Sequence, residues 1–301
     1  MRVLSLSLLC LVQLCVACTP SFQSASEVVD LRVLAIRVDP PEAQVDLDAG
    51  TVDDVTVRVL IADPAATLDA TMTGRLCAPT DTLRCDGTVA VSLPPVTHPV
   101  GEAFSYSISV PADTLRSALA NDKLAGLGGL RVQLQINVDD GNPSKDVAAE
   151  KVLLFSRKDH VPNHVPLLDG VTVTQDGVAL RTVQPGETLQ LAQGKTFGLR
   201  PLPHTCKPSG VDICTPAIES YDTVDLSGKS IHLTEQLSYS FFTTKGAELD
   251  RDSADEPPGG TAPPDGLARV DSTAAGSGTL WIVVRDGRGG ESWITLPWSS
   301  N

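Results

Sequence analysis

The chain has 301 residues, with 23 Lys plus Arg against 37 Asp plus Glu, which gives a formal net charge of −14. This charge argues against electrostatic binding to nucleic acid or to anionic lipid, because both carry negative phosphates. Aromatic residues make up only 4% of the chain, whereas 24 Gly and 22 Pro are present. Such a composition is typical of many short strands joined by turns, and predicts a β-rich protein without a nucleic-acid partner.

The N-terminus has the layout of an export signal. Arg2 supplies one positive charge, and residues 3–16 form an apolar run interrupted by only three polar residues. The run is too short to cross a hydrocarbon core of about 30 Å as a helix. We therefore expect a signal peptide over residues 1–17, cleaved after the small residue Ala17.

The sequence LCVAC at residues 14–18 resembles the lipobox of bacterial lipoproteins, in which the cysteine is acylated. It departs from that motif at Cys15, where Leu is usual. The resemblance implies that Cys18 carries lipid, palmitate among its acyl chains, and anchors the protein to a membrane. Thr19 replaces the Asp that retains many such proteins at the inner membrane, which favours the outer membrane or cell surface. The alternative is a plain secreted protein with a free Cys18.

Cysteine pairing supports lipidation of Cys18. Two of the seven cysteines, Cys10 and Cys15, leave with the signal peptide. Four others form two pairs with seven residues between partners: Cys77 with Cys85, and Cys206 with Cys214. In an exported chain these pairs are expected to be disulfides, too wide for a CxxC redox motif and without nearby zinc ligands. Cys18 is then the one thiol left over.

The mature chain is expected to begin with a flexible Ser-rich tether over residues 18–27, followed by a first sandwich domain over residues 28–157. Alternation of apolar and polar residues predicts half-buried strands in this domain. They cover residues 31–38, 55–61, 104–110, 130–138 and 152–155. The first should end at Pro40, because proline cannot continue a strand ladder. Helical spacing of Leu115 and Leu119 predicts one short helix within residues 111–120.

A linker is expected over residues 158–166, which contain Pro162 and Pro166, and a second sandwich domain over residues 167–301. Its predicted strands lie near residues 171–173, 189–191, 231–233, 237–241 and 279–298. Residues 250–266 contain two Pro-Pro pairs and several Gly, and are expected to form a long mobile loop without regular structure.

The two halves share a plan, because each carries a cysteine pair and closes with a long apolar strand, an Asp-Gly turn and a final strand. The predicted fold class is all-β, with two tandem immunoglobulin-like β-sandwich domains after a lipoprotein signal peptide. The sequence VVRDGRGG at residues 283–290 resembles the last hairpin of bacterial immunoglobulin-like and polycystic-kidney-disease-type repeats. Residues 31–42, ending in Pro-Pro-Glu, resemble surface lipoproteins of myxobacterial type. These resemblances imply fold and location but no activity.

Residues with metal-binding or catalytic chemistry do not form a recognisable motif. His160 and His164 are four apart, but Pro162 between them argues against a shared helix face, so they are assigned to the linker. The acidic run at residues 250–256 lacks EF-hand spacing and is interpreted as a solvated loop. There is no GxSxG or HExxH sequence. We expect no metal, no cofactor and no enzymatic activity, although a triad assembled from distant loops would leave no sequence signal.

The tryptophans are the remaining candidates for ligand contact. An even-length turn at residues 286–290 would place Trp281 on one sheet face with Ile294, Leu296 and Trp298, and Trp293 on the other. One face must be core, and the other would expose aromatic surface suited to a sugar or a protein partner. The candidate contacts are Trp281 and Trp298. The simpler interpretation is that tryptophan fills the sandwich core.

The function predicted from the sequence is that of a lipid-anchored cell-envelope protein, acting as a non-enzymatic binding or scaffolding module. Its partners would be the membrane, through Cys18, and an envelope protein or glycan. The alternative is an accessory carbohydrate-binding protein of a surface polysaccharide or degradative system, which requires exposed tryptophans. A third class, a hydrolase, requires a pocket that brings Ser or carboxylates to a His.

Overall fold

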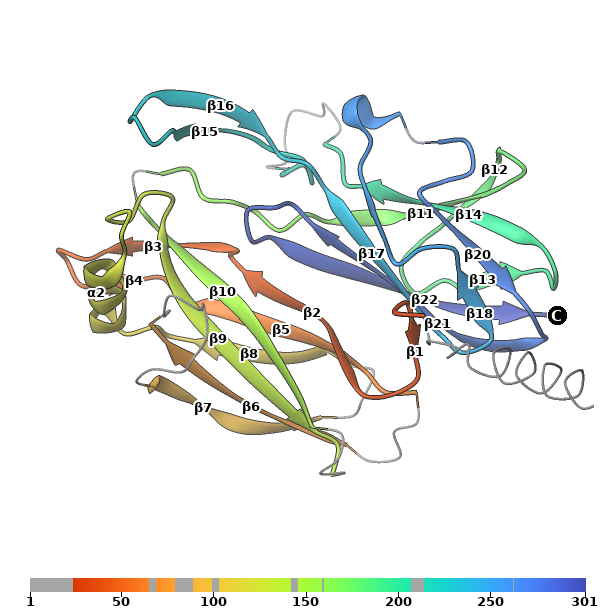
Figure 1. The fold of residues 1–301 in the computed structure, drawn as a ribbon, viewed down its shortest axis with the longest axis horizontal. Coiled ribbons are helices and arrows are strands. Elements are labelled where there is room, and N and C mark those ends of the chain that lie inside the picture. Colours follow the sequence, from red (N-terminus) through yellow and green to blue (C-terminus); the bar gives the residue numbers. More distant parts are fainter. Residues whose placement is uncertain are drawn as a thin grey trace, which may run out of the picture.

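The computed structural model describes residues 24–64, 69–78, 89–98, 103–141, 146–158, 160–206, 214–261 and 263–301. The signal peptide, Cys18 and Cys85 lie outside these residues. The described chain consists of strands, with one α-helix, α2 (Ala112–Asn121), and one short 3-10 helix, η1 (Pro258–Gly260). The predicted all-β class is therefore confirmed. The molecule is elongated, and the two halves of the chain follow one another along its long axis (Figure 1).

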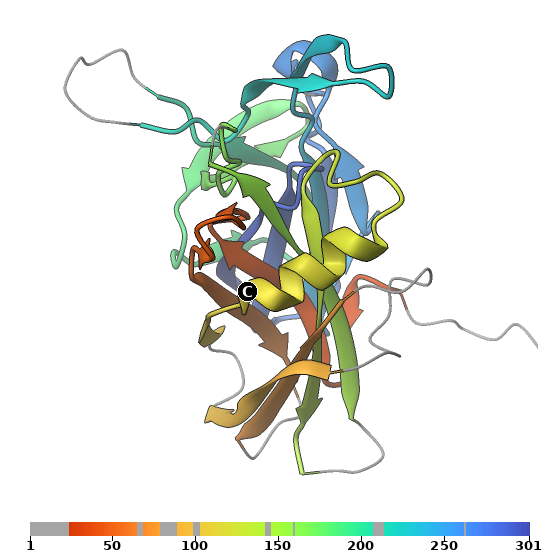
Figure 2. The same cartoon turned by 90° about the vertical axis from the view of Figure 1, so that its left-hand side faces the viewer.

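The first half, up to residue 157, packs a three-stranded sheet against a six-stranded sheet. The smaller sheet has the order β2 (Arg32–Asp39), β5 (Val55–Ala62), β8 (Ala103–Ile108). The larger has the order β4 (Thr51–Val52), β3 (Glu42–Asp46), β10 (Val147–Arg157), β9 (Leu130–Asp139), β6 (Ala70–Cys77), β7 (Val89–His98). Helix α2 covers the far end of this half (Figures 1 and 2) and buries Leu115.

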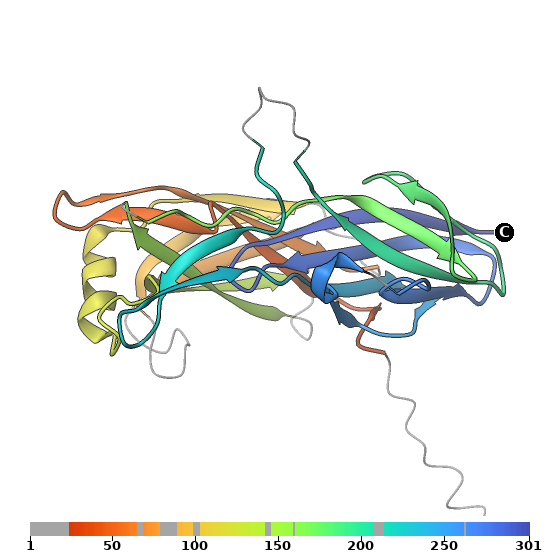
Figure 3. The same ribbon diagram turned by 90° about the horizontal axis from the view of Figure 1, so that it is seen from above.

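The second half, from residue 167, has a six-stranded and a five-stranded sheet. One runs β1 (Glu27–Val28), β17 (Ser238–Thr244), β21 (Gly276–Arg285), β22 (Glu291–Ser300), β13 (Leu189–Leu191), with β19 (Ser253–Asp255) also on β17. The other runs β12 (Val178–Val183), β11 (Leu168–Gln175), β14 (Thr196–Pro203), β20 (Ala268–Ser272), β18 (Ala247–Leu249). A separate hairpin, β15 (Ser220–Val224) with β16 (Ser230–Thr234), reaches over the first half (Figures 1 and 3).

Each half has its own hydrophobic core, and the alternation seen in the sequence produces it. In β8, Phe104, Tyr106 and Ile108 are buried while the intervening serines are exposed, as expected for a strand with one face on a core. The closing strands pair as antiparallel hairpins in both halves, β9 with β10 and β21 with β22. The division into domains at residues 158–166 stays a prediction, although the two cores are separate clusters.

Several strands were not predicted because proline and glycine interrupt their patterns. Strand β3 begins directly after Pro40 and Pro41, β7 contains Pro94, and β14 contains Gly198 and Pro201. Strand β7 is an edge strand, where a missing N–H is tolerated. In β14, a Cβ on Gly198 would collide with the backbone oxygen of Asp265, so glycine is required by close packing rather than by a turn.

The predicted unstructured loop at residues 250–266 is wrong in part. Residues Ser253–Asp255 form β19, which pairs with β17, and Pro258–Gly260 form η1. The Glu256 carboxylate is buried and accepts a hydrogen bond from the Tyr239 hydroxyl at 2.7 Å. Ladder pairing and this buried contact hold a segment that the Pro and Gly content suggested would be free.

The predicted tether is also shorter than expected, because its last residues belong to the folded body. Ser26 is buried, and β1 adds a parallel strand to β17 of the second half. Val28 is fully buried. The chain therefore enters the fold beside the junction of the two halves, rather than at the outer end of the first (Figure 1).

Candidate functional site

The two halves meet at an apolar contact that we call the seam. It is formed by β1 and by the outer faces of β2, β5 and β21. Its residues are Val28, Leu34, Ala35, Leu60, Ala62, Trp281 and Val283. Phe242 and Trp293 pack against it and are partly buried. Val283 is fully buried, as a residue of a domain core would be. Apolar burial of this kind favours association of the halves.

The register of the β21–β22 hairpin explains the seam and corrects the sequence prediction. Arg285 pairs with Glu291, so the turn contains five residues, an odd number. Ile282, Leu296 and Trp298 therefore face the core of the second half, whereas Trp281 faces the seam. The predicted grouping of Trp281 with Trp298 is wrong because the turn was taken as even.

The tryptophan candidates for ligand contact are both buried. Trp281 is 6% exposed and Trp298 is 2% exposed. The proposal that they form an exposed aromatic surface is therefore wrong: one packs in the seam and the other in the core. Trp293 lies on the seam side, opposite to what a core-filling role would require.

Asp286 builds the turn that carries the polar part of the junction. Its Oδ1 accepts hydrogen bonds from the backbone N–H of Arg288 at 2.7 Å and of Gly290 at 3.0 Å. Gly287 and Gly289 have φ of +79° and +105°, which glycine adopts without a Cβ penalty. The sequence DGRGG thus specifies a five-residue turn with the Arg288 side chain directed at the first half.

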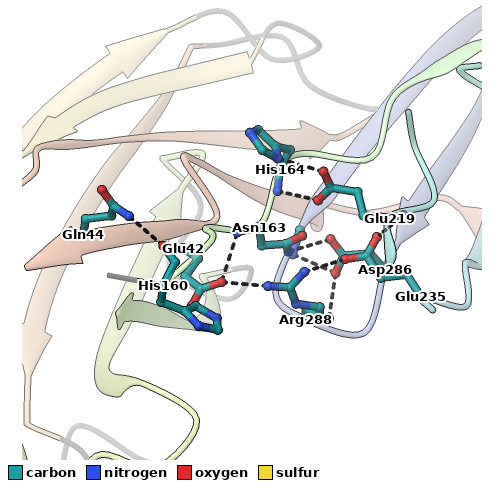
Figure 4. A network of polar contacts seen from close by, with 10 residues as sticks. Glu42, Gln44, His160, Asn163, His164, Glu219, Glu235, Asp286 and Arg288 are labelled. Carbon is teal, nitrogen blue, oxygen red and sulfur yellow. Dashed lines mark hydrogen bonds and ion pairs between the residues drawn. The ribbon is translucent and has the colours of Figure 1, made fainter. Parts of the chain in front are cut away.

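Arg288 is the centre of a buried ionic network (Figure 4). Its Nη2 donates to Glu42 Oε2 of β3 at 3.0 Å, and its Nη1 donates to Glu235 Oε1, which follows β16, at 3.1 Å. Its guanidinium also lies 3.9 Å from the ring centroid of Tyr221 in β15, a cation–π contact. One side chain therefore joins the first half, the second half and the β15–β16 hairpin.

The carboxylates of this network outnumber its guanidinium, and burial changes their protonation. Desolvation raises the pKa of Glu235 to about 7, with the nearby Asp286 charge adding to the effect and Arg288 opposing it. Desolvation likewise raises the pKa of Asp286 above its usual value, against the hydrogen bond from Asn163. The junction thus contains a carboxyl group that titrates close to neutral pH.

The linker is part of the network. The backbone N–H of Asn163, a fully buried residue, donates to Glu42 Oε2 at 3.0 Å, and its Nδ2 donates to Asp286 Oδ2 at 2.8 Å. The hydroxyl of Ser292 donates to the carbonyl oxygen of Pro166. The linker is therefore fixed between the halves by hydrogen bonds (Figure 4).

The two linker histidines contact different carboxylates. His160 Nε2 lies 3.5 Å from Glu42 Oε1, whereas His164 Nδ1 lies 2.8 Å from Glu219 Oε1. Both contacts are ion pairs only when the histidine is protonated. The two rings are four residues apart in the sequence but do not share a ligand position, because each contacts its own carboxylate (Figure 4).

A second polar contact lies at the base of the same turn, between the seam and the Arg288 network. Glu291 of β22 is buried and lies 2.8 Å from Lys151 Nζ of β10 and 2.7 Å from Arg285 Nη2. The backbone N–H of Ile36 in β2 donates to the same carboxylate at 3.4 Å. Two neighbouring ionic contacts therefore join the halves at the turn end of the apolar seam.

The second predicted cysteine pair is present as a disulfide between Cys206 and Cys214. Cys77, at the end of β6, is fully buried and disulfide-bonded, whereas its predicted partner Cys85 lies outside the described residues. The surroundings of the second pair were missed from the sequence. His204 Nε2 lies 3.3 Å from Cys214 Sγ, and His204 Nδ1 lies 2.7 Å from Asp169 Oδ1.

His204, Cys206 and Cys214 also form the one group of three or more metal-ligand side chains close together within the part of the chain that the structure describes. The expectation of no zinc ligand near this cysteine pair was wrong, because His204 lies only two residues before Cys206. Both sulfurs are joined to each other, so neither is a thiolate ligand in this state.

The acidic run at residues 250–256 lines a cavity of about 540 Å³, together with Arg251, Arg269 and Pro257. The carboxylates of Asp250, Asp252 and Glu256 have protein partners. Asp250 accepts from the backbone N–H of Arg269 at 2.8 Å, and Glu256 accepts from the Tyr239 hydroxyl. Hydrogen bonding to Arg269 outweighs partial burial and lowers the pKa of Asp250. This is a partly structured surface, held by arginine and tyrosine contacts.

No described helix is long and apolar enough to cross a membrane. The Cys206–Cys214 disulfide agrees with a location outside the cytoplasm, because disulfides persist in oxidising compartments.

Comparison with known proteins gives no family. No family model and no curated protein matches the chain. Solved structures with partial likeness include red sea bream transglutaminase, at 15% identity and a TM-score of 0.28, covering 91% of this chain and 32% of the transglutaminase. Another is the tandem V-type regions of VCBP3, a v-region-containing chitin binding protein, at 10% identity and a TM-score of 0.29, covering 89% of this chain and 100% of that one. A third is dimeric latent PorU from Porphyromonas gingivalis, at 12% identity and a TM-score of 0.21, covering 94% of this chain and 25% of PorU. The chain spans about a third of the length of the transglutaminase.

Proposed function

We propose that the chain is a lipid-anchored cell-envelope protein that acts as a non-enzymatic scaffolding or binding module. Its two sandwiches would form one rigid body close to a membrane. The observation that carries the proposal is the junction of the halves, where Val283 is fully buried and Arg288 joins both halves and the hairpin. Separate domains on a flexible linker would leave these groups solvated.

The entry point of the chain supports a short distance to the membrane. Residues 19–23 alone separate Cys18 from the first described residue, Ser24. Even fully extended, these residues span only about 20 Å. Because β1 enters beside the seam, lipid on Cys18 would hold both halves near the bilayer, rather than leaving the second half at the end of a rod.

The lipid anchor is tested by metabolic labelling with a clickable fatty acid. Cys18→Ser should abolish labelling, whereas Cys10→Ser, a matched change within the apolar run, should retain it. Labelling that persists in Cys18→Ser would reject the anchor. Membrane fractionation then tests the outer-membrane location: the wild type should be found in the outer membrane, and Thr19→Asp should move it to the inner membrane.

Scaffolding is tested by crosslinking in the native envelope. The wild type should give a discrete crosslinked partner that is lost when the halves are uncoupled by Val283→Asp, while fatty-acid labelling is kept. Partner capture that is unchanged by Val283→Asp would contradict a role for the rigid pair. The carbohydrate-binding alternative is not proposed, because its main support was exposed tryptophan, and Trp281 and Trp298 are buried.

A further inference from the structure

A histidine–carboxylate pair lies against one sulfur of the Cys206–Cys214 disulfide. Asp169 belongs to β11 and His204 directly follows β14, and these two strands pair with Leu168 opposite Pro203. The ladder thus places Asp169 and His204 side by side, 2.7 Å apart between Oδ1 and Nδ1. The other ring nitrogen, Nε2, faces Cys214 Sγ at 3.3 Å.

This order of groups is suited to stabilising a thiolate. A hydrogen bond of 2.7 Å to a carboxylate fixes a proton on Nδ1, which leaves Nε2 directed at the sulfur. A proton on Nε2 makes the ring an imidazolium, stabilised by Asp169 on one side and by an anionic sulfur on the other. Imidazolium beside a cysteine is a known physical cause of a more acidic thiol.

The two sulfurs differ in their contact with the histidine. His204 Nε2 lies 3.3 Å from Cys214 Sγ, within hydrogen-bond distance. Exchange requires an attacking thiolate to reach one sulfur and expel the other, and it is faster when the expelled thiolate is more stable. Leaving-group stabilisation thus favours attack at Cys206 and departure of Cys214.

We propose that the Cys206–Cys214 disulfide is a redox-active site that exchanges with an external dithiol, with His204 holding Cys214 as the leaving thiolate and Asp169 positioning His204. The dithiol's thiolate forms a bond to Cys206 Sγ, the Cys206–Cys214 bond breaks, and its electron pair goes to Cys214 Sγ. The second thiol of the dithiol, as thiolate, then displaces Cys206, which takes a proton from water. The dithiol is oxidised to a disulfide and the protein disulfide is reduced by two electrons.

This inference goes beyond the proposed function and does not rest on it, because the step consumes the protein's own disulfide. The disulfide of Cys77 serves as an internal reference, since that cysteine is fully buried. Reduction of the purified full-length chain by dithiothreitol, followed by alkylation and peptide mass spectrometry, measures both disulfides in one sample. The Cys206–Cys214 pair should be reduced at least about tenfold faster.

The variants separate the role of His204 from access alone. His204→Gln should slow reduction of this pair about three- to tenfold, and Asp169→Asn should have a smaller effect in the same direction. His232→Gln is the matched control, because His232 forms a similar pair with Asp222 at 2.9 Å on the β15–β16 hairpin. It should leave the rate unchanged. Equal rates in the wild type, His204→Gln and Asp169→Asn would overturn the proposal.

A second measurement reports thiolate formation directly. In Cys206→Ser, Cys214 is a free thiol, and its alkylation by iodoacetamide can be followed against pH. With His204 present, the reactive form should persist to at least about one pH unit below the ordinary thiol range near 8.5. Adding His204→Gln should return the profile to that range. An ordinary profile in Cys206→Ser alone would show that the imidazole does not act on Cys214, and would also overturn the proposal.

Discussion

The β21–β22 hairpin has two faces with nearly the same apolar character but different surroundings. One face, with Ile282 and Leu296, lies in the core of the second half. The other, with Trp281 and Val283, lies in the seam against the first half. A strand buried on both faces is normally central to a three-layer structure. The first half therefore acts as a further layer on this sheet, and the seam is built like a core.

The apolar seam differs from the polar contacts at its turn end. The seam gains free energy from burial, whereas the polar contacts hold charges that lose hydration and are compensated by one another. Around Arg288 the compensation depends on protonation, because the pKa of Glu235 is about 7. The apolar seam should therefore set how strongly the halves associate, and the polar contacts should set their orientation and its pH dependence.

The largest expected effect comes from placing a charge in the apolar seam. Val283→Asp buries an unpaired carboxylate in the seam and should destabilise the protein by about 3–5 kcal/mol. The control is Val178→Asp on β12, where the side chain is 63% exposed and the change should stay within about 0.5 kcal/mol. Urea unfolding measures both. Similar free energies of unfolding for the two variants would contradict a core-like seam.

Removing the Arg288 guanidinium should destabilise the protein less than placing a charge in the apolar seam. Arg288→Met keeps volume but leaves Glu42 and Glu235 without their guanidinium, so we expect a loss of about 2–4 kcal/mol at pH 8. The loss should be smaller at pH 5, where Glu235 is protonated. Arg251→Met, at a half-exposed arginine, is the control. A loss that is independent of pH would contradict the network's electrostatic role.

Glu235→Gln tests the titration itself. The pKa of Glu235 in the folded state, about 7, lies above its ordinary value of 4.5, so the folded state binds more protons between these pH values. Its contribution to stability is therefore present at low pH and is lost as pH rises through 7. Relative to the wild type, the variant should gain about 1–2 kcal/mol between pH 5 and pH 8. Parallel stability–pH curves for the two proteins would reject the raised pKa.

The smallest effect is expected at the second ionic contact. Lys151→Met removes one partner of Glu291, but Arg285 still pairs with that carboxylate. The variant should lose about 1 kcal/mol in thermal or urea unfolding. A loss as large as that of Arg288→Met would show that the two ionic contacts contribute equally.

The sequence was sufficient to predict the strands with a clear apolar pattern. It was insufficient to predict what their faces pack against. β8 was predicted because one face is apolar, and the two closing hairpins were predicted because an apolar strand leads into an Asp-Gly turn. The faces of Trp281 and Trp293 were not, since a single residue in the turn inverts every assignment. The five-residue turn depends on Asp286 accepting two backbone hydrogen bonds, which composition does not specify.

The candidate sites show the same limit. The disulfide spacing identified the Cys206–Cys214 pair, but Asp169 and His204 join it through strand pairing. Glu42 lay beyond the predicted strand end and Asn163 lay in the predicted linker, although both are almost fully buried around Arg288. Long-range ladders and the relative placement of the halves decide these contacts, and neither leaves a local periodic signal.

Equilibrium unfolding followed by two probes tests the central claim, that the halves form one rigid unit, most directly. All three tryptophans belong to the second half, where Trp298 lies in the core and Trp281 and Trp293 lie at the seam. Their fluorescence therefore reports on the second half and on its contact with the first half. Far-UV circular dichroism reports on strands in both halves. We predict one urea transition with the same midpoint by both probes in the wild type. Two separated transitions by circular dichroism, or different midpoints for the two probes, would show that the halves unfold independently and would contradict the account.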